Sequence, residues 1–358
     1  MKKIIFLPFI NGNKADEGGR QWRKALEDTF LGGEGKDITD EINRIRGLKS
    51  AASGDDVAMY RNQLHGLKMN RQSKWLKRLV EKTAEEFSST ISALPENVRN
   101  SDDHIIVAAL PEFFWYDIND NHRHEPGDSA KNGIYIKGYH KPLYDVNLID
   151  VLLHGNPLAK LTEDYNNLII FAGTAMWKII NEENNKDEKI NNTLIIYHGG
   201  EVANTWSKHY FSSIDGFCTP VWFGSGPNDY YYELVKDKLG TYGTQFESAP
   251  ITEFKGVKFT YDICLDFAVK KNDVIQPPLS TTLCGGEKTD VNVLVSAGMP
   301  IDDKDLTKIN SPVILRCDGW AVAPFAEIAS NVAYPPNNPN SVMTNADIIG
   351  RLETTINV

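Results

Sequence analysis

The sequence predicts an α/β protein in which buried β-strands alternate with helical segments. Short apolar runs rich in β-branched and aromatic residues recur along the chain, as strands require. Residues 71–92 instead carry apolar side chains at three- and four-residue steps, which predicts a helix. The runs expected to form strands are Lys3–Phe9, His104–Leu110, Asn167–Ala172, Thr193–Tyr197, Val257–Cys264, Val291–Ser296 and Val313–Arg316. Because strands and helices interleave, the class is α/β.

The composition indicates one ordinary globular domain over residues 1–358. Hydrophobic residues make up 41% of the chain and charged residues 24%, and no segment has the composition of an interdomain linker. Three segments differ from the rest through charge or through glycine and proline content: residues 11–70, 116–165 and 216–250. We expect these three segments to be inserts that decorate a compact core.

Charge and cysteine usage exclude several classes of function. The net charge of −10 argues against non-specific binding to nucleic acid or to an anionic membrane. We interpret the first ten residues as a buried strand rather than an export signal, and no run reaches the ~18 apolar residues of a membrane span. Cys218, Cys264, Cys284 and Cys317 are widely spaced, which favours reduced thiols, a cytoplasmic location and no zinc site.

Three strand ends deliver polar residues that are suited to chemistry. Glu112 follows one expected strand, Lys208 follows an apolar run that ends at Ser207, and Cys264 ends a third run. Open α/β sheets place their chemistry at the carboxyl ends of strands. One carboxylate, one ammonium group and one thiol at three such ends make a plausible nucleophilic site.

Each of these residue types has a separate task in nucleophilic catalysis. A thiol reacts as thiolate, so Cys264 needs a base, and a carboxylate such as Glu112 can serve when burial raises its pKa. Lys208 and the backbone N–H of Leu265 are suitable donors for negative charge that develops on the substrate. Taken singly, the same residues are also consistent with a packed core thiol, a helix cap at Glu112 and a solvated Lys208. His209 as the base of a dyad with Cys264 is a further alternative, although on an extended strand it would point away from Lys208.

Together, these segments resemble the nitrilase, or carbon–nitrogen hydrolase, superfamily. The resemblance covers residues 1–9 and about 72–350 apart from the inserts. Its motifs are Leu110-Pro111-Glu112, Leu168–Thr174, Asn192-Thr193 with Ile195–Gly200, Trp206-Ser207-Lys208, Gly256–Asp266 and Val293–Pro300. The resemblance implies a four-layer α-β-β-α sandwich with two mixed sheets face to face, and a homodimer or higher homo-oligomer. It also implies Glu112 as general base and acid, Lys208 as stabiliser of the tetrahedral intermediate, and Cys264 as the residue that forms the thioester.

The sequence departs from the family pattern at two supporting positions. Many members carry a second glutamate shortly after the lysine, and the matching position here falls close to Asp215, with Glu233 and Glu247 as other candidates. At the position after the cysteine, where the family usually has an aromatic or charged residue, this chain has Leu265. Only the backbone N–H of Leu265 is then available as a donor.

The resulting hypothesis is a hydrolase that cleaves a non-peptide carbon–nitrogen bond of a small molecule, with no metal or organic cofactor. An amide is favoured over a nitrile by analogy alone. Two alternatives stay open: an N-acyltransferase that passes the same thioester to an amine, and an inactive binding protein with the same fold.

Overall fold

The computed structural model describes most of the chain, and everything below concerns those residues. They are residues 1–9, 19–112, 114–115, 144–181, 186–209, 250–267, 270–271, 274–275, 277–285, 287–296, 299, 301, 309–319, 326–330, 341–343 and 348–358. The predicted inserts therefore fall partly outside them, and their status as inserts stays a prediction.

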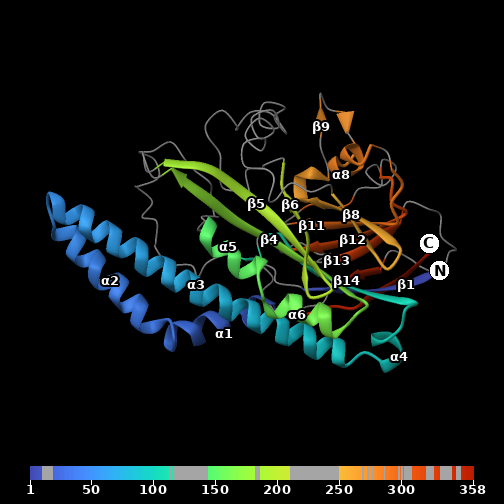
Figure 1. Cartoon of the computed structure of the whole chain (residues 1–358), viewed down its shortest axis with the longest axis horizontal. Helices are drawn as coiled ribbons and strands as arrows, with labels where there is room; N and C mark the ends of the chain where they lie inside the picture. Colours follow the sequence, from blue (N-terminus) through green and yellow to red (C-terminus); the bar gives the residue numbers. More distant parts are fainter. Residues whose placement is uncertain are drawn as a thin grey trace.

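The first sheet is mixed and contains both ends of the chain (Figure 1). Its strand order is β15 (Leu352–Ile356), β1 (Lys2–Pro8), β2 (His104–Leu110), β4 (Leu168–Asn181), β5 (Lys186–His198) and β6 (Glu201–Ser207), with β3 (Tyr144–Asp145) beside β4. Strands β1, β2 and β4 are parallel, whereas β4, β5 and β6 form an antiparallel meander. The parallel strands are almost continuously apolar because both of their faces are buried.

The second sheet is also mixed. Its order is β14 (Ser341–Met343), β13 (Ala326–Ser330), β12 (Val313–Asp318), β11 (Val291–Ser296), β8 (Val257–Ile263) and β7 (Ile251–Phe254). Strands β8, β11 and β12 run parallel, and the outer strands are antiparallel to their neighbours. A separate short hairpin pairs β9 (Lys270–Lys271) with β10 (Val274–Ile275).

The two sheets pack face to face through one apolar core. Successive side chains of β1 point to opposite faces of the first sheet. Ile4 and Phe6 face the second sheet, whereas Ile5 and Leu7 face the helices. Across the interface, the rings of Phe171 on β4 and Phe259 on β8 have centroids 5.8 Å apart. The inner faces of both sheets are therefore sealed from water between layers that stack about 10 Å apart.

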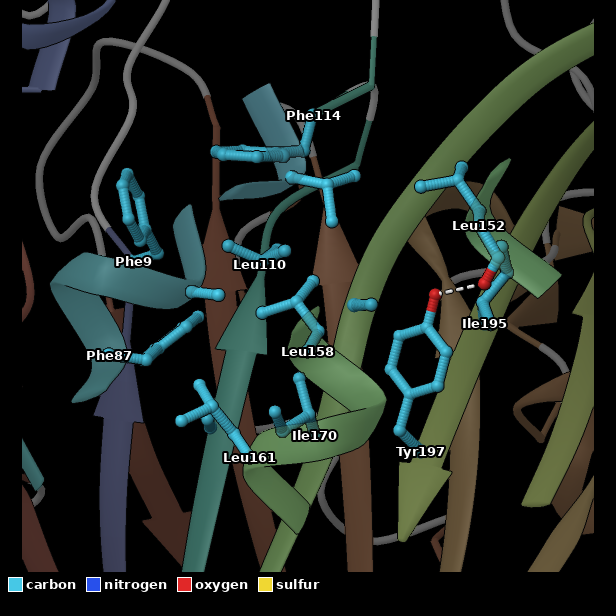
Figure 2. Close-up of a cluster of buried hydrophobic side chains, with 14 of the residues drawn as sticks. Phe9, Phe87, Leu110, Phe114, Leu152, Leu158, Leu161, Ile170, Ile195 and Tyr197 are labelled. Carbon is cyan, nitrogen blue, oxygen red and sulfur yellow. Dashed lines mark hydrogen bonds between the residues drawn. The ribbon is translucent and has the colours of Figure 1, made fainter. Parts of the chain in front are cut away.

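Helices cover the outer face of the first sheet (Figure 1). They are α1 (Gly19–Gly32), α3 (Asp55–Ser92), α5 (Val146–Leu153) and α6 (Pro157–Asp164), with α4 (Glu96–Arg99) leading into β2. In Figure 2, Leu158 and Leu161 of α6 lie over Leu110 and Ile170 of the sheet. The hydroxyl of Tyr197 on β5 donates to the Leu152 carbonyl of α5, as the dashed line in Figure 2 marks.

The predicted helix at residues 71–92 is the second part of a longer one. Helix α3 begins at Asp55, and its first turns pair with α2 (Lys36–Ala51) in an antiparallel hairpin that extends beyond the sheets (Figure 1). Ile42, Ile45 and Leu64 form a small core of their own in that hairpin. The composition of residues 11–70 is mostly helical, as observed where the structure describes them, but their weak amphipathicity gave no bounds for these helices.

The outer face of the second sheet carries the short helix α8 (Leu279–Leu283), which packs on β8. A separate apolar cluster of Phe267, Leu294 and Ile314 lies on this face with Ile309 and Ala329. The described residues thus form the predicted α-β-β-α arrangement, which confirms the fold class.

One predicted segment has more regular structure than expected. The glycine and proline content of residues 116–165 is typical of loops, yet α5 and α6 occupy much of the described part and place Leu148, Leu152, Leu158 and Leu161 in the core. The glycine and proline content of the whole segment concealed the helical spacing of these leucines.

Candidate active site

Glu112 and Lys208 form a fully buried ion pair. Glu112 lies two residues beyond the end of β2, and Lys208 lies one residue beyond the end of β6. The Lys208 Nζ donates to Glu112 Oε1 at 2.8 Å, and both side chains are 0% exposed. The solvated Lys208 considered from sequence is therefore wrong. Because desolvation of two charges is expensive, such a pair is weak evidence of a stabilising role and more indicative of function.

Asn192 on β5 connects the two members of this pair. Its side-chain Nδ2 donates to Glu112 Oε1 at 2.9 Å, and its carbonyl oxygen accepts from the backbone N–H of Lys208 at 2.8 Å. Asn192 belongs to one of the sequence motifs, but the sequence alone assigned it no role. The available signal was an asparagine at the start of a strongly apolar run, where a buried amide needs partners.

Cys264 lies where β8 turns into a 3-10 helix, η4 (Cys264–Asp266). It is 3% exposed and has a φ of 48°, in the left-handed region that residues with a Cβ rarely adopt. Such backbone strain clusters at functional sites, where a side chain is held in an orientation that a regular strand would not give. Leu265 is the middle residue of this turn, so its backbone follows the thiol directly.

Asp266 ties the Cys264 turn to the segment that carries Lys208. Its carboxylate accepts from the backbone N–H of His209 at 3.1 Å to Oδ1 and 3.2 Å to Oδ2, and Asp266 is fully buried. The chain that follows β6 in one sheet therefore contacts the turn that follows β8 in the other. Cys264 comes two positions before Asp266 in the chain, and Lys208 comes directly before His209.

The side chain of His209 packs against the Trp206 indole. The two rings stack with centroids 4.6 Å apart, and burial lowers the pKa of His209 to about 4. The imidazole is consequently neutral at physiological pH.

The ends of β2 and β12 also meet at this edge. Gly319, just past β12, approaches so closely that an added Cβ would lie 3.2 Å from the Glu112 carbonyl oxygen. On β12, Cys317 Sγ donates to the Ala109 carbonyl at 3.4 Å. The register pairs Ile263 with Val295 and Val295 with Cys317, so the Cys264 turn emerges at the same level of the second sheet. The carboxyl ends of the parallel strands in both sheets therefore lie at the same edge of the sandwich.

Backbone contacts fix the chain on both sides of Glu112. Gly173 has a φ of +61°, and an added Cβ would lie 2.4 Å from the Pro111 carbonyl oxygen. The Trp115 backbone N–H donates to the Thr174 carbonyl at 3.3 Å, and its indole N–H donates to the Ala172 carbonyl. The described residues Phe114 and Trp115 are not helical, which makes a helix-capping role for Glu112 wrong.

A buried polar network lies on the outer side of β8, the strand that leads to Cys264. Asp262 on β8 accepts from the Ser280 N–H at 3.0 Å, the Ser280 hydroxyl at 2.6 Å and the Asn292 amide at 2.8 Å. Burial raises the pKa of Asp262 to about 6, although all three hydrogen bonds oppose that shift. This network holds α8 to β8 on the outer side of the second sheet.

Several predicted features lie outside the described residues. Asp215, Glu233, Glu247, Cys218 and the His122–His124 segment are among them. Within the described ranges, no three His, Cys, Asp or Glu side chains gather as metal ligands. No helix in those ranges has an apolar stretch long enough to cross a bilayer.

Neither a protein-family model nor a curated protein sequence matches the chain. Solved structures do. An amidase from Nesterenkonia sp. AN1, with acrylamide added at its active-site cysteine, is 8% identical over 99% of this chain and 93% of that one, with a TM-score of 0.43. A CN-hydrolase superfamily protein from Xanthomonas campestris is 11% identical over 77% and 84%, with a TM-score of 0.35.

A glutamine-dependent NAD+ synthetase from Acinetobacter baumannii is also similar, at 10% identity over 78% of this chain and 43% of that one, with a TM-score of 0.40. These identities and scores are low, so we base the function on this chain's own strand order and side-chain contacts. The chain is similar in structure to amidases of the nitrilase superfamily and to another protein of the CN-hydrolase superfamily.

Proposed function

We propose that the chain is a divergent member of the nitrilase superfamily and hydrolyses a non-peptide carbon–nitrogen bond in a small molecule. The substrate is an amide rather than a nitrile. Cys264 is the nucleophile, Glu112 the general base and acid, and Lys208 the stabiliser of the tetrahedral intermediate. The observation that carries the proposal is the buried Glu112–Lys208 pair, with the Cys264 turn joined to the Lys208 segment through Asp266.

The chemistry begins with transfer of the Cys264 proton to the Glu112 carboxylate. The thiolate then attacks the amide carbon, and the carbonyl π electrons move to oxygen, where the Lys208 ammonium and the Leu265 N–H stabilise the negative charge. Collapse breaks the carbon–nitrogen bond as Glu112 returns its proton to the leaving amine or ammonia. A thioester on Cys264 remains.

Water completes the cycle. Glu112, again a carboxylate, removes a proton from water as the water oxygen attacks the thioester carbon. The second tetrahedral intermediate expels the Cys264 thiolate, which recovers a proton from Glu112, and the carboxylic acid leaves. Each bond broken in this cycle is matched by a bond formed, and the proposed steps use neither a metal nor an organic cofactor.

The burial of this site supports its assignment to chemistry. An ammonium group and a carboxylate at 0% exposure act in a low-dielectric environment, where their effect on developing charge is stronger than in water. Asp215 as an additional acid, a homodimer or higher homo-oligomer, and a cytoplasmic location also belong to the proposal.

The test is intact-mass analysis after incubation with a panel of small amides and nitriles. Wild type is expected to accumulate an acyl adduct or release ammonia, Cys264→Ala to do neither, and Glu112→Gln to lose most turnover. Cys284→Ala is the matched thiol control: burial raises the pKa of Cys284 to about 11, so its removal should leave turnover unchanged. Added amines distinguish the N-acyltransferase, because they would capture the acyl group at the expense of free acid.

The results separate the alternatives. Adducts that persist in Cys264→Ala would refute the assigned nucleophile. Absence of Cys264-dependent adduct and turnover across the panel would favour the inactive binding protein.

A further inference from the structure

Arg23 in α1 is a buried cation that contacts the chain directly after Glu112. Its side chain is 3% exposed, and its Nη1 donates to the Phe114 carbonyl at 2.9 Å. Its Nε donates to Glu27 Oε1 at 3.2 Å, and the guanidinium carbon lies 5.5 Å from the centre of the Trp75 ring. Three separate contacts therefore fix the guanidinium group.

The Phe114 carbonyl, which accepts this hydrogen bond, lies close to Glu112 along the chain. It lies two residues beyond Glu112, and the Phe114 ring packs between Phe9 and Trp115 at centroid distances of 5.2 Å and 4.8 Å. A buried carbonyl that lost its donor would have to move towards another partner. Because Glu112 lies on the same short stretch of backbone, such a movement would carry the carboxylate away from Lys208.

The helix that delivers Arg23 is firmly joined to the core. Trp22 packs on Phe9 at 5.2 Å, and its indole N–H donates to Glu86 of α3 at 2.9 Å. Leu26 and Phe30 of the same helix are buried in the main core. Yet α1 lies within the segment 11–70 that the sequence marks as an addition, so this chain supplies the contact from outside the two sheets.

Burial of the arginine costs free energy that its surroundings only partly offset. Burial is the largest influence on its partner Glu27, whose pKa lies above the ordinary value even though Arg23 lowers it. A leucine or methionine would fill the same apolar space beside Trp75 without desolvating a charge. What an apolar residue cannot provide is a rigid donor for the Phe114 carbonyl.

We propose that Arg23 is a positioning residue for Glu112: it fixes the backbone after the proposed base so that the carboxylate stays aligned with Lys208 and Cys264. This inference rests on the proposed function and adds a residue from α1 to the proposed machinery. Arg23 acts through the backbone and does not touch the substrate.

The kinetic test compares Arg23→Met, Arg23→Lys and a matched control, Arg78→Met. Arg78 lies on α3, is one-third exposed and pairs with surface carboxylates 3.8 Å away, so its replacement removes an arginine without disturbing Glu112. We expect Arg23→Met to lower kcat by about 10- to 100-fold, because a small misplacement of a catalytic group has that effect. KM should change by less than about 2-fold, since substrate contacts are intact. Arg23→Lys keeps a donor and should recover part of the loss.

A second readout does not need turnover. The rate at which iodoacetamide alkylates Cys264, followed by peptide mass, reports how well Glu112 acts as a base towards the thiol. We expect Glu112→Gln and Arg23→Met to slow this rate together and Arg78→Met to match wild type. All variants are compared at a temperature at which they retain the wild-type circular dichroism.

The outcomes separate the two proposals. Slower alkylation in Glu112→Gln with an unchanged rate and kcat in Arg23→Met would overturn the role of Arg23 alone. An unchanged rate in Glu112→Gln would overturn the proposed function and, with it, the positioning role. A loss of thermal stability in Arg23→Met without a change in kcat or alkylation would show Arg23 to be structural only.

Discussion

Lys208 Nζ lies 2.8 Å from Glu112 Oε1 although 96 positions separate the two residues in the chain. Only the alignment of β2 and β6 in one sheet, joined through β4 and β5, brings them together. The contact therefore depends on the sheet being complete, and it reports whether the site has formed.

Lys208→Met should destabilise the fold by about 3–5 kcal/mol at pH 7, because it leaves the Glu112 carboxylate buried without its ammonium partner. The double variant Lys208→Met/Glu112→Gln removes both charges and should be more stable than Lys208→Met alone. Denaturant unfolding at pH 7 measures both. Equal stability of the single and double variants would mean that Glu112 is not charged in the fold.

Asn192→Leu should lower kcat by about 10- to 100-fold, since a hydrogen bond to a charged group contributes about 1.5–3 kcal/mol. The same substitution leaves the backbone bond between the Asn192 carbonyl and the Lys208 N–H in place. Steady-state kinetics with the best amide of the panel provides the measurement. A variant in which only KM changes would assign Asn192 to substrate binding instead.

The buried Asp262 should make stability depend on pH between about 4 and 6. Its pKa is raised from 3.8 to about 6 in the fold, so the folded state binds a proton that the unfolded state has released in this window. Its contribution is thus present at low pH and is lost as pH rises through the folded pKa, by about 3 kcal/mol for a shift of about two units.

Asp262→Asn removes this titration, and comparison of unfolding free energies at pH 4 and pH 6.5 isolates it because the remaining groups are common to both proteins. Wild type should lose stability relative to the variant on going to pH 6.5. Identical pH dependence in the two proteins would show that Asp262 does not hold its proton in the fold.

Gly173→Ala should be far more disruptive than Gly155→Ala. The two glycines have similar φ values of +61° and +58°, so both substitutions carry the backbone cost of about 1–2 kcal/mol. Only at Gly173 would the new Cβ meet an atom, 2.4 Å from the Pro111 carbonyl oxygen, which adds about 1–3 kcal/mol and displaces the backbone before Glu112. Thermal unfolding and kcat of both variants test this difference, and equal effects would contradict it.

The central strands could be predicted from the sequence because their signal is local. Each of the seven expected strand segments falls within or overlaps an observed strand, from β1 to β12. Buried parallel strands are long apolar runs, and residues that end them stand out by contrast. Glu112 and Lys208 were chosen on that basis, and the structure brings their side chains together.

What the sequence missed depends on partners far away in the chain. Arg23 is one charged residue in a charged segment, and only its contact 91 positions away at Phe114 accounts for its burial. The role of Asn192 likewise becomes evident only from its hydrogen bond to Glu112, 80 positions earlier. The left-handed backbone of Cys264 has no sequence signal either, since such conformations are expected mainly at glycine or asparagine. The catalytic roles themselves, and that of Asp215, stay predictions.

The pairing of β1 with β15 sets an order for folding during synthesis. Lys2–Phe6 pair in register with residues 352–356, so β1 acquires one of its two neighbours from a segment synthesised about 350 residues later. Until then one edge of β1 lacks its native partner, and such an edge readily pairs with another chain. A nascent chain halted shortly before residue 352 should therefore be prone to aggregation, even though every residue discussed for catalysis has already been added.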